Sequence, residues 1–147
     1  MTAEENKAVV RRYNEITQQF FRGGDVNGFD EVCAPDLVHH GPAMMPRDLA
    51  GLKQMAPAFR AAFPDVELVT EQLFAEGDRV VDLVTVRGTH QGEFMGIPPS
   101  GKPIEMQEIH IARIADGKIV ERWTQFDVFG LLQQVGGVPT SPEPATA

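Results

Sequence analysis

The sequence contains one cysteine, Cys33, among 147 residues, so it has no partner for an internal disulfide and fits a reducing compartment. Basic residues are also scarce: 13 Lys and Arg stand against 21 Asp and Glu, for a formal net charge of −8. Without a run of Lys or Arg, binding to nucleic acid or to anionic lipid is disfavoured. No apolar run approaches the ~18 residues that a membrane span needs, and the N-terminus has no apolar signal segment. We therefore expect a cytoplasmic protein that binds neither nucleic acid nor membrane.

Helical periodicity is concentrated in the first half of the chain. Helices are expected to begin after Thr2, near Phe29, after Asp48 and after Asp127. The first should bury a stripe of Val9, Tyr13, Ile16 and Phe20. The second, at 29–33, should end before Pro35, and a short extended segment should follow at 37–40. We expect Pro57 to kink the third helix.

From Val66 the spacing of the apolar residues changes from a helical period to an alternating one. Strands are expected at 66–74, 80–90, 104–114 and 119–127, with hairpin turns at 75–78 and 115–118. Helices followed by an antiparallel sheet predict an α+β fold, in which a curved sheet wraps around the N-terminal helices and encloses a pocket. The Gly- and Pro-rich loop at 91–103 is long enough to have a functional role. We predict one domain, residues 1–137, and a disordered tail, residues 138–147.

The turn at 115–118 decides which side chains of the last two strands share a face. A two-residue turn would place His110 opposite Trp123, whereas a three-residue turn with a bulge would place His110 opposite Arg122 and Glu108 opposite Thr124. The three-residue turn sorts polar from apolar side chains better, so we predict it. It gathers Ile109, Ile111, Ile119 and Trp123 on one face, and Met106, Glu108, His110, Val120, Arg122, Thr124 and Phe126 on the other.

The two faces predict different roles. The first is apolar enough to be a subunit interface, which predicts a homodimer through the outer face of the sheet. The second mixes directed polar groups with apolar ones, which is typical of a small-molecule pocket. Alternatively, Glu108 and Arg122 form an ion pair that only closes the sheet, with His110 a hydrogen-bonded bystander. Because four polar groups lie on one inward stripe, we favour a functional role.

Five short motifs occur in order along the chain. They are Phe63-Pro-Asp65, Gly88–Gly92, Gly96–Gly101, Asp116–Trp123 and Gly130–Gly136. In these motifs, and from about Asn6 to Pro139, the sequence resembles the SnoaL-like polyketide cyclase (ester cyclase) family. The resemblance implies an NTF2-like cone without cofactor or metal, in a dimer or higher oligomer. It also implies closure of a ring in an aromatic polyketide methyl ester by intramolecular aldol condensation, a lyase or isomerase reaction.

The resemblance also assigns roles to residues. In these cyclases the third strand carries Gln-x-His and the fourth carries His-Trp-Asp, whose Asp is the acid and base. Glu108 then falls on the Gln, His110 on the strand-three His, and Arg122, Trp123 and Thr124 on His-Trp-Asp. Thr124 thus stands at the Asp position, and a hydroxyl cannot act as a base near neutral pH.

Two assignments of the catalytic groups remain. We expect His110 to be the base, its basicity raised by Glu108 or lowered by Arg122. Alternatively, Glu108 is the base, desolvated in the apolar cone, and His110 is the donor. In both cases Arg122 would be the fixed positive charge for an enolate or a substrate carboxylate.

The remaining substrate-binding candidates are Thr124, Tyr13, His40, His90, Phe126 and Met106. Tyr13 could instead be a core aromatic residue. Only one of His39 and His40 can face inward, and the family pattern favours His40, although a hydrogen-bonded turn histidine is the alternative. His90 either lies at the rim of the pocket or pins the loop at 91–103. Adjacent histidines do not have metal-ligand spacing, so no metal site is expected.

Three functions follow from these observations. The first is a cofactor-independent cyclase that acts on a hydrophobic, carbonyl-rich small molecule. The second is another reaction in the same cone, such as hydration, dehydration, epoxide opening or hydroxylation. The third is a small-molecule-binding module without catalysis, which the threonine at position 124 favours.

Overall fold

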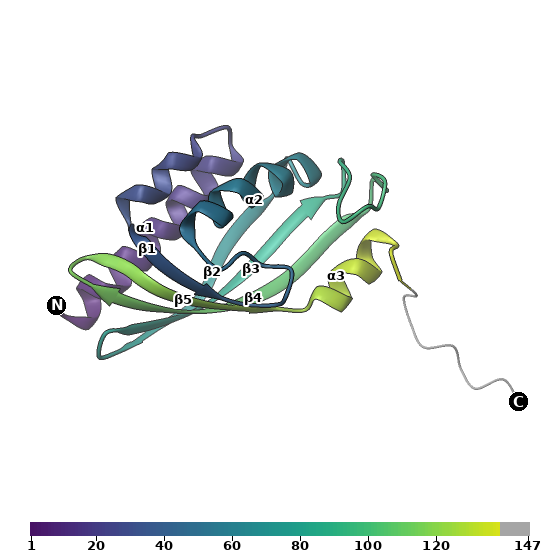
Figure 1. The fold of residues 1–147 in the computed structure, drawn as a ribbon. Helices are drawn as coiled ribbons and strands as arrows, with labels where there is room; N and C mark the ends of the chain where they lie inside the picture. The colour runs from purple at the N-terminus through teal and green to yellow at the C-terminus, as the bar shows by residue number, and fades with distance from the viewer. Residues whose placement is uncertain (139–147) are drawn as a thin grey trace, which may run out of the picture.

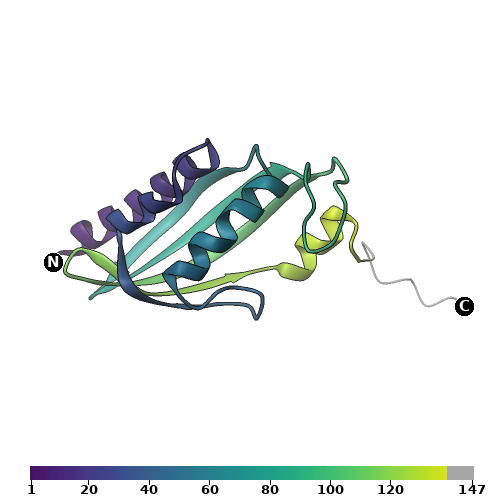
Figure 2. The same cartoon turned by 45° about the horizontal axis from the view of Figure 1, so that its top comes forward.

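The computed structural model describes residues 1–138 and has the predicted α+β class. Its elements are α1 (Ala3–Phe21), η1 (Val26–Glu31), β1 (Cys33–His40), α2 (Leu49–Ala62), β2 (Glu67–Glu76), β3 (Arg79–Thr89), β4 (Pro103–Ala115), β5 (Lys118–Phe126) and α3 (Val128–Val135). The strands form one sheet in the order β1-β5-β4-β3-β2. Neighbouring strands are antiparallel except β1 and β5, which run parallel. Figures 1 and 2 show α1 and α2 over one face of the curved sheet, and α3 after the end of β5.

Three helices begin where their capping residues predict. The hydroxyl oxygen of Thr2 accepts a hydrogen bond from the backbone N–H of Glu5 at 3.1 Å, which opens α1. The carboxylates of Asp48 and Asp127 each accept from a backbone N–H three residues later at 2.8 Å. Such a cap contributes ~1 kcal/mol. The starts of α1, α2 and α3 are therefore set locally, and α2 continues through Pro57 to Ala62.

The buried stripe of α1 differs from the predicted one at a single position. It includes Val10, Tyr13, Ile16 and Phe20, with Val10 in place of Val9. Val9 is only partly buried and packs at the edge of the core. The first helix therefore presents its aromatic side chains to the sheet as predicted.

The short second helix lies earlier than predicted. It is a 3₁₀ helix at Val26–Glu31, and the edge strand β1 begins at Cys33, before Pro35. A proline is tolerated there because β1 has only one neighbour, β5, and the pairing is irregular between Cys33 and Val38. The prediction that Pro35 separates a helix from a later strand is wrong.

The β4–β5 hairpin has a two-residue turn, not the predicted three-residue one. Ala115 pairs with Lys118, which leaves Asp116 and Gly117 as the loop. Both loop residues have positive φ, 51° and 76°, as a type I′ turn requires. Glycine adopts this conformation readily, and Asp is one of the few other residues that does.

A β-bulge beyond the turn shifts the register by one residue. Ile114 pairs with Ile119, whereas Arg113 pairs with Glu121, so Val120 is an extra residue in β5. Beyond the bulge, the side chains of β4 and β5 share faces of the sheet as they would after a three-residue turn.

The predicted pocket residues consequently share one face, in a register different from the predicted one. His110 pairs with Thr124 rather than with Arg122, and Glu108 pairs with Phe126 rather than with Thr124. The predicted turn is one residue too long and the predicted strand lacks the bulge. These two errors compensate, so beyond the bulge the same side chains still point to the same face of the sheet. The face is as predicted, and the pairing within it is shifted by two residues.

Ile119 is misplaced by the same error. It lies between the turn and the bulge, so it faces the core and is fully buried. The predicted apolar outer face therefore keeps Ile109, Ile111 and Trp123 but loses Ile119. Of these, Ile109 has 52% of its surface exposed.

The apolar core consists of two clusters. One joins α1 and η1 to β1 and the turn ends of β4 and β5, and the other joins the end of α2 to β3, the start of β4 and α3. No helix within residues 1–138 is long and apolar enough to cross a membrane. Apart from Val138, the predicted tail lies outside the described residues.

Candidate active site

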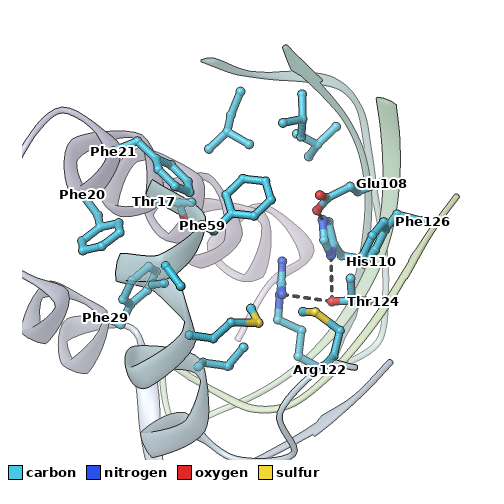
Figure 3. Close-up of a pocket in the computed structure, with 18 of the residues that line it drawn as sticks. Thr17, Phe20, Phe21, Phe29, Phe59, Glu108, His110, Arg122, Thr124 and Phe126 are labelled. Carbon is cyan, nitrogen blue, oxygen red and sulfur yellow. Dashed lines mark hydrogen bonds and ion pairs between the residues drawn. The ribbon is translucent and has the colours of Figure 1, made fainter. Parts of the chain in front are cut away.

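A cavity of about 390 Å³ lies between the helices and the concave face of the sheet, and both core clusters contribute to its wall (Figure 3). Most of the wall is apolar. Its aromatic and thioether side chains are Tyr13, Phe20, Phe21, Phe29, Phe59, Phe94, Phe126, Met44, Met45, Met55, Met95 and Met106. Thioethers are flexible and polarisable, so the wall can adjust to the shape of a ligand. The volume lies within the ~300–1,000 Å³ range of small-molecule sites.

Polar side chains from two neighbouring strands interrupt this wall. Glu108 and His110 come from β4, and Arg122 and Thr124 come from β5. Figure 3 shows the four side chains close to one another on one side of the cavity. Met106, Phe126 and Tyr13, three of the predicted substrate-binding residues, also line the cavity.

The hydroxyl of Thr124 is the centre of this polar group. Nη1 of Arg122 donates a hydrogen bond to Oγ1 of Thr124 at 3.1 Å, and Nδ1 of His110 lies 3.1 Å from the same oxygen (Figure 3). A third partner is Nε2 of His39, at 2.9 Å. A hydroxyl has one proton and two lone pairs, so these three contacts use its full capacity.

His110 is held at both of its ring nitrogens. While Nδ1 contacts Thr124, Nε2 lies 3.1 Å from Oε1 of Glu108. Burial raises the pKa of Glu108, but the hydrogen bond from His110 and the charges of His110 and Arg122 outweigh it and hold this pKa below its ordinary value. The second carboxylate oxygen of Glu108 has no hydrogen-bond partner among residues 1–138. Because Glu108 lines the cavity, this oxygen is free to accept a hydrogen bond from a ligand.

Arg122 brings a nearly buried positive charge to the cavity, with 7% of its surface exposed. Its guanidinium carbon lies 4.4 Å from the centre of the Tyr13 ring, which favours a cation through its π face. Within residues 1–138, Arg122 forms no ion pair with a carboxylate. Burial raises the pKa of Tyr13 although the charge of Arg122 opposes this, so the phenol stays neutral. The guanidinium is therefore available to an anionic group in the cavity.

His39, not His40, faces the polar group, and the prediction for His40 is wrong. β1 runs parallel to β5, with His39 level with Arg122 and His40 level with Trp123. His40 lies on the outer side, where Nε2 contacts Oε2 of Glu121 at 2.7 Å and the ring stacks on Trp123. His39 is 1% exposed and does not line the cavity, but it supports Thr124 from behind.

His90 is also outside the cavity wall and pins the adjacent loop. It is completely buried, and Nδ1 contacts both the hydroxyl of Ser100 at 2.8 Å and its backbone N–H at 3.1 Å. Backbone hydrogen bonds from His90 to Lys102 and from Gly101 to His90 close the same loop. The loop-pinning alternative for His90 is therefore the one that the geometry favours.

Two buried polar side chains near the site were not among the predicted site residues. One is His39, and the other is Asp82 on β3, which is level with His110 and accepts a hydrogen bond from Nδ2 of Asn14 at 3.1 Å. The inward parity of Asp82, between Val80 and Val84, was a signal available in the sequence. Among residues 1–138, no group of three or more His, Cys, Asp or Glu side chains is arranged to hold a metal ion.

An α+β fold whose helices and curved sheet enclose an apolar cavity with a few polar groups on its wall is the architecture of NTF2-like proteins. Residues 7–135 match the family described as SnoaL-like polyketide cyclase, and the chain belongs to this family. The resemblance found in the motifs is thereby confirmed.

Relatives with solved structures or curated functions agree with this assignment. The chain is 30% identical to nogalonic acid methyl ester cyclase from Streptomyces nogalater, over 79% of this chain and 89% of that protein. It is 34% identical to IdmH, a candidate polyketide cyclase from Streptomyces antibioticus, with a TM-score of 0.77 over 89% of this chain and 98% of IdmH. It is 32% identical to AclR, a candidate hydroxylase from Streptomyces galilaeus, with a TM-score of 0.81 over 97% of this chain and 87% of AclR.

Proposed function

We propose that this protein is a polyketide cyclase-like enzyme that closes a ring in a hydrophobic, carbonyl-rich small molecule by an aldol-type reaction, with Glu108 as the acid and base and His110 as its hydrogen-bond partner. The observation that carries the proposal is the contact between His110 Nε2 and Glu108 Oε1, at 3.1 Å, on the wall of an apolar cavity. Relatives named as methyl ester cyclases support the substrate class, an aromatic polyketide methyl ester.

The proposed reaction needs one proton to leave a carbon and one to reach an oxygen. The free oxygen of the Glu108 carboxylate removes a proton from a carbon flanked by two carbonyls, which leaves an enolate. The enolate carbon attacks a ketone carbon of the same molecule and forms the new carbon–carbon bond, and the ketone oxygen becomes an alkoxide. Protonated Glu108 then returns its proton to this alkoxide, so the product is an isomer of the substrate.

In this proposal Glu108, rather than His110, contacts the substrate. Both ring nitrogens of His110 already face protein oxygens, whereas Glu108 keeps a free one. The preference for His110 as the base is therefore reversed, and His110 becomes the partner that orients and stabilises the Glu108 carboxylate. The carbon acid is activated by its own carbonyls, so a carboxylate of lowered pKa is a sufficient base.

Arg122 supplies the proposed electrostatic stabilisation. Its guanidinium is nearly buried, lines the cavity and has no carboxylate partner among residues 1–138. A fixed positive charge in a dry site stabilises a developing enolate much more than it would in water. Tyr13 supports this charge through its ring and, with Phe126 and Met106, contacts the body of the substrate.

The likeness to AclR favours a second candidate, hydroxylation in the same cavity. Product mass separates the two functions, because aldol closure leaves the mass unchanged and hydroxylation adds one oxygen atom. The proposal is tested by incubating the protein with an aromatic polyketide methyl ester that carries a 1,3-dicarbonyl side chain. We expect an isomer, whose formation is lost in His110→Ala and kept in His40→Ala. Undiminished turnover by His110→Ala would contradict the proposal.

We also propose a homodimer through the outer face of the sheet. Ile109, Ile111 and Trp123 lie on that face, away from the cavity, and Ile109 is half exposed. An apolar sheet face that is not covered by a helix is a suitable dimer interface.

A further inference from the structure

A row of hydrogen bonds leads from a backbone carbonyl to the polar group of the cavity. It begins at the carbonyl oxygen of Pro46, which lies 2.8 Å from Nδ1 of His39. A carbonyl has no proton to donate, so Nδ1 of His39 must carry the proton of this hydrogen bond. Burial lowers the pKa of His39 to about 4, so at neutral pH its ring has a single proton. Nε2 of His39 therefore presents a lone pair.

This lone pair fixes the direction of the Thr124 hydroxyl. Oγ1 of Thr124 lies 2.9 Å from Nε2 of His39, so the hydroxyl must donate its only proton to His39. The oxygen can then only accept from its other two neighbours, Nη1 of Arg122 and Nδ1 of His110, each at 3.1 Å. His110 must therefore carry a proton on Nδ1.

We infer that His39 is a positioning residue: through the Thr124 hydroxyl it holds a proton on Nδ1 of His110 and leaves Nε2, which faces Glu108, as the nitrogen that exchanges a proton. Its meaning for catalysis rests on the proposed function, but the tautomer is a property of the free protein. If the hydroxyl turned toward His110 instead, Nε2 would carry the permanent ring proton. The Glu108–His110 pair would then hold one exchangeable proton fewer.

The other groups around His110 do not decide whether Nδ1 carries a proton, because the carboxylate of Glu108 faces only Nε2 and accepts the proton there. Those that face it from the packed elements are Glu108 on β4, Arg122 and Thr124 on β5, Asp82 on β3, Tyr13 on α1 and His39 on β1. Arg122 can only donate, and Asp82 is hydrogen-bonded to Asn14 rather than to His110. Only the hydroxyl of Thr124 can either give a proton to Nδ1 or accept one from it.

Nitrogen NMR of the histidine rings tests the inference without substrate. The chain has four histidines, so the ring spectra are simple to assign by substitution. The protein is labelled with ¹⁵N, and wild type is compared with His39→Gln and His39→Leu. We expect Nδ1 of His110 to carry a proton in wild type, with a second proton shared between Nε2 and the carboxylate of Glu108. His39→Gln should keep the proton on Nδ1, because an amide can donate to Pro46 and accept from Thr124, whereas His39→Leu should leave the ring with a proton on Nε2 alone. A wild-type ring protonated on Nε2 alone, or an unchanged ring in folded His39→Leu, would overturn the inference.

A second variant covers the possibility that His39→Leu does not fold. Thr124→Val removes the hydroxyl and keeps His39, so His110 should lose its single preferred tautomer. A folded Thr124→Val protein with the wild-type tautomer overturns the inference. In activity assays, His39→Leu should lower kcat about tenfold or more and shift the pH profile with little change in KM, and His39→Gln should restore both. If the NMR result is as expected but wild type has no cyclase activity, the proposed function is contradicted and the inference about His39 stands.

Discussion

The ring of His110 lies between two oxygens of different character, Oγ1 of Thr124 at Nδ1 and Oε1 of Glu108 at Nε2, each 3.1 Å away. One of these oxygens cannot be a base near neutral pH, and the other is a carboxylate. The family pattern implied by the motifs has its carboxylate on the last strand, at the position of Thr124. In this chain the carboxylate is Glu108 on β4, on the other side of the same histidine.

This arrangement predicts that the carboxylate can be moved back. Glu108→Gln combined with Thr124→Asp recreates the family pattern, and Asp at position 124 can accept hydrogen bonds from His110 and Arg122. We expect the double variant to close the ring at least about tenfold faster than Glu108→Gln alone, a difference of ~1.4 kcal/mol in the barrier. Single-turnover ring closure measures it. Equal rates for the two variants would show that position 124 cannot replace Glu108.

Arg122 should matter more for activity than for stability. Arg122→Met removes one hydrogen bond to Thr124 and the contact with Tyr13, so the free energy of unfolding should fall by about 1–2 kcal/mol. The same change should lower kcat/KM by about 10²–10³, the usual cost of losing a group that stabilises an oxyanion. Urea unfolding and steady-state kinetics measure the two effects. Arg113→Met, which breaks the half-exposed pair with Glu121, is the control and should leave kcat/KM unchanged. An active Arg122→Met enzyme would contradict the assigned role.

His39 should make stability depend on pH. Its pKa is about 4 in the folded protein and near 6.5 in the unfolded chain, so between these values the unfolded state binds a proton that the folded state does not. The free energy of unfolding should therefore fall as the pH is lowered through this window, by at most about 1.4 kcal/mol per pH unit. Urea unfolding at several pH values should give a shallower slope for His39→Gln than for wild type. Identical slopes for His39→Gln and wild type would contradict the account.

The proposed dimer has its own test. Ile109→Glu places a charge on the outer face of the sheet and should convert the protein to a monomer, as measured by size-exclusion chromatography with light scattering. Phe129→Glu, at an exposed apolar residue of α3, should leave the oligomeric state unchanged. A dimer that survives Ile109→Glu would place the interface elsewhere.

Much of the fold was predictable because its signals are local. The capping residues Thr2, Asp48 and Asp127 mark three helix starts, and side-chain alternation assigns the inward face of β4 correctly. The β4–β5 register was not predictable in detail, because the bulge at Val120 has no strong sequence signal. It also has the same effect as a longer turn on which side chains of the two strands share a face.

The pairing of β1 with β5 was beyond local reasoning. It brings His39 to Thr124 across 85 positions of sequence, and the parity of two adjacent histidines cannot say which one faces inward until that neighbour is known. The polar residues of one hairpin could therefore be predicted as a group. The histidine that orients them could not.

The central claim is that Glu108 transfers the proton in the cavity. It is tested most directly by the rate of ring closure of an aromatic polyketide methyl ester by Glu108→Gln, compared with Glu105→Gln on the exposed face of the same strand. We predict that Glu108→Gln lowers kcat by about 10²–10⁴ with a much smaller change in KM, and that Glu105→Gln behaves as wild type. Ring closure by Glu108→Gln at the rate of Glu105→Gln would contradict the claim.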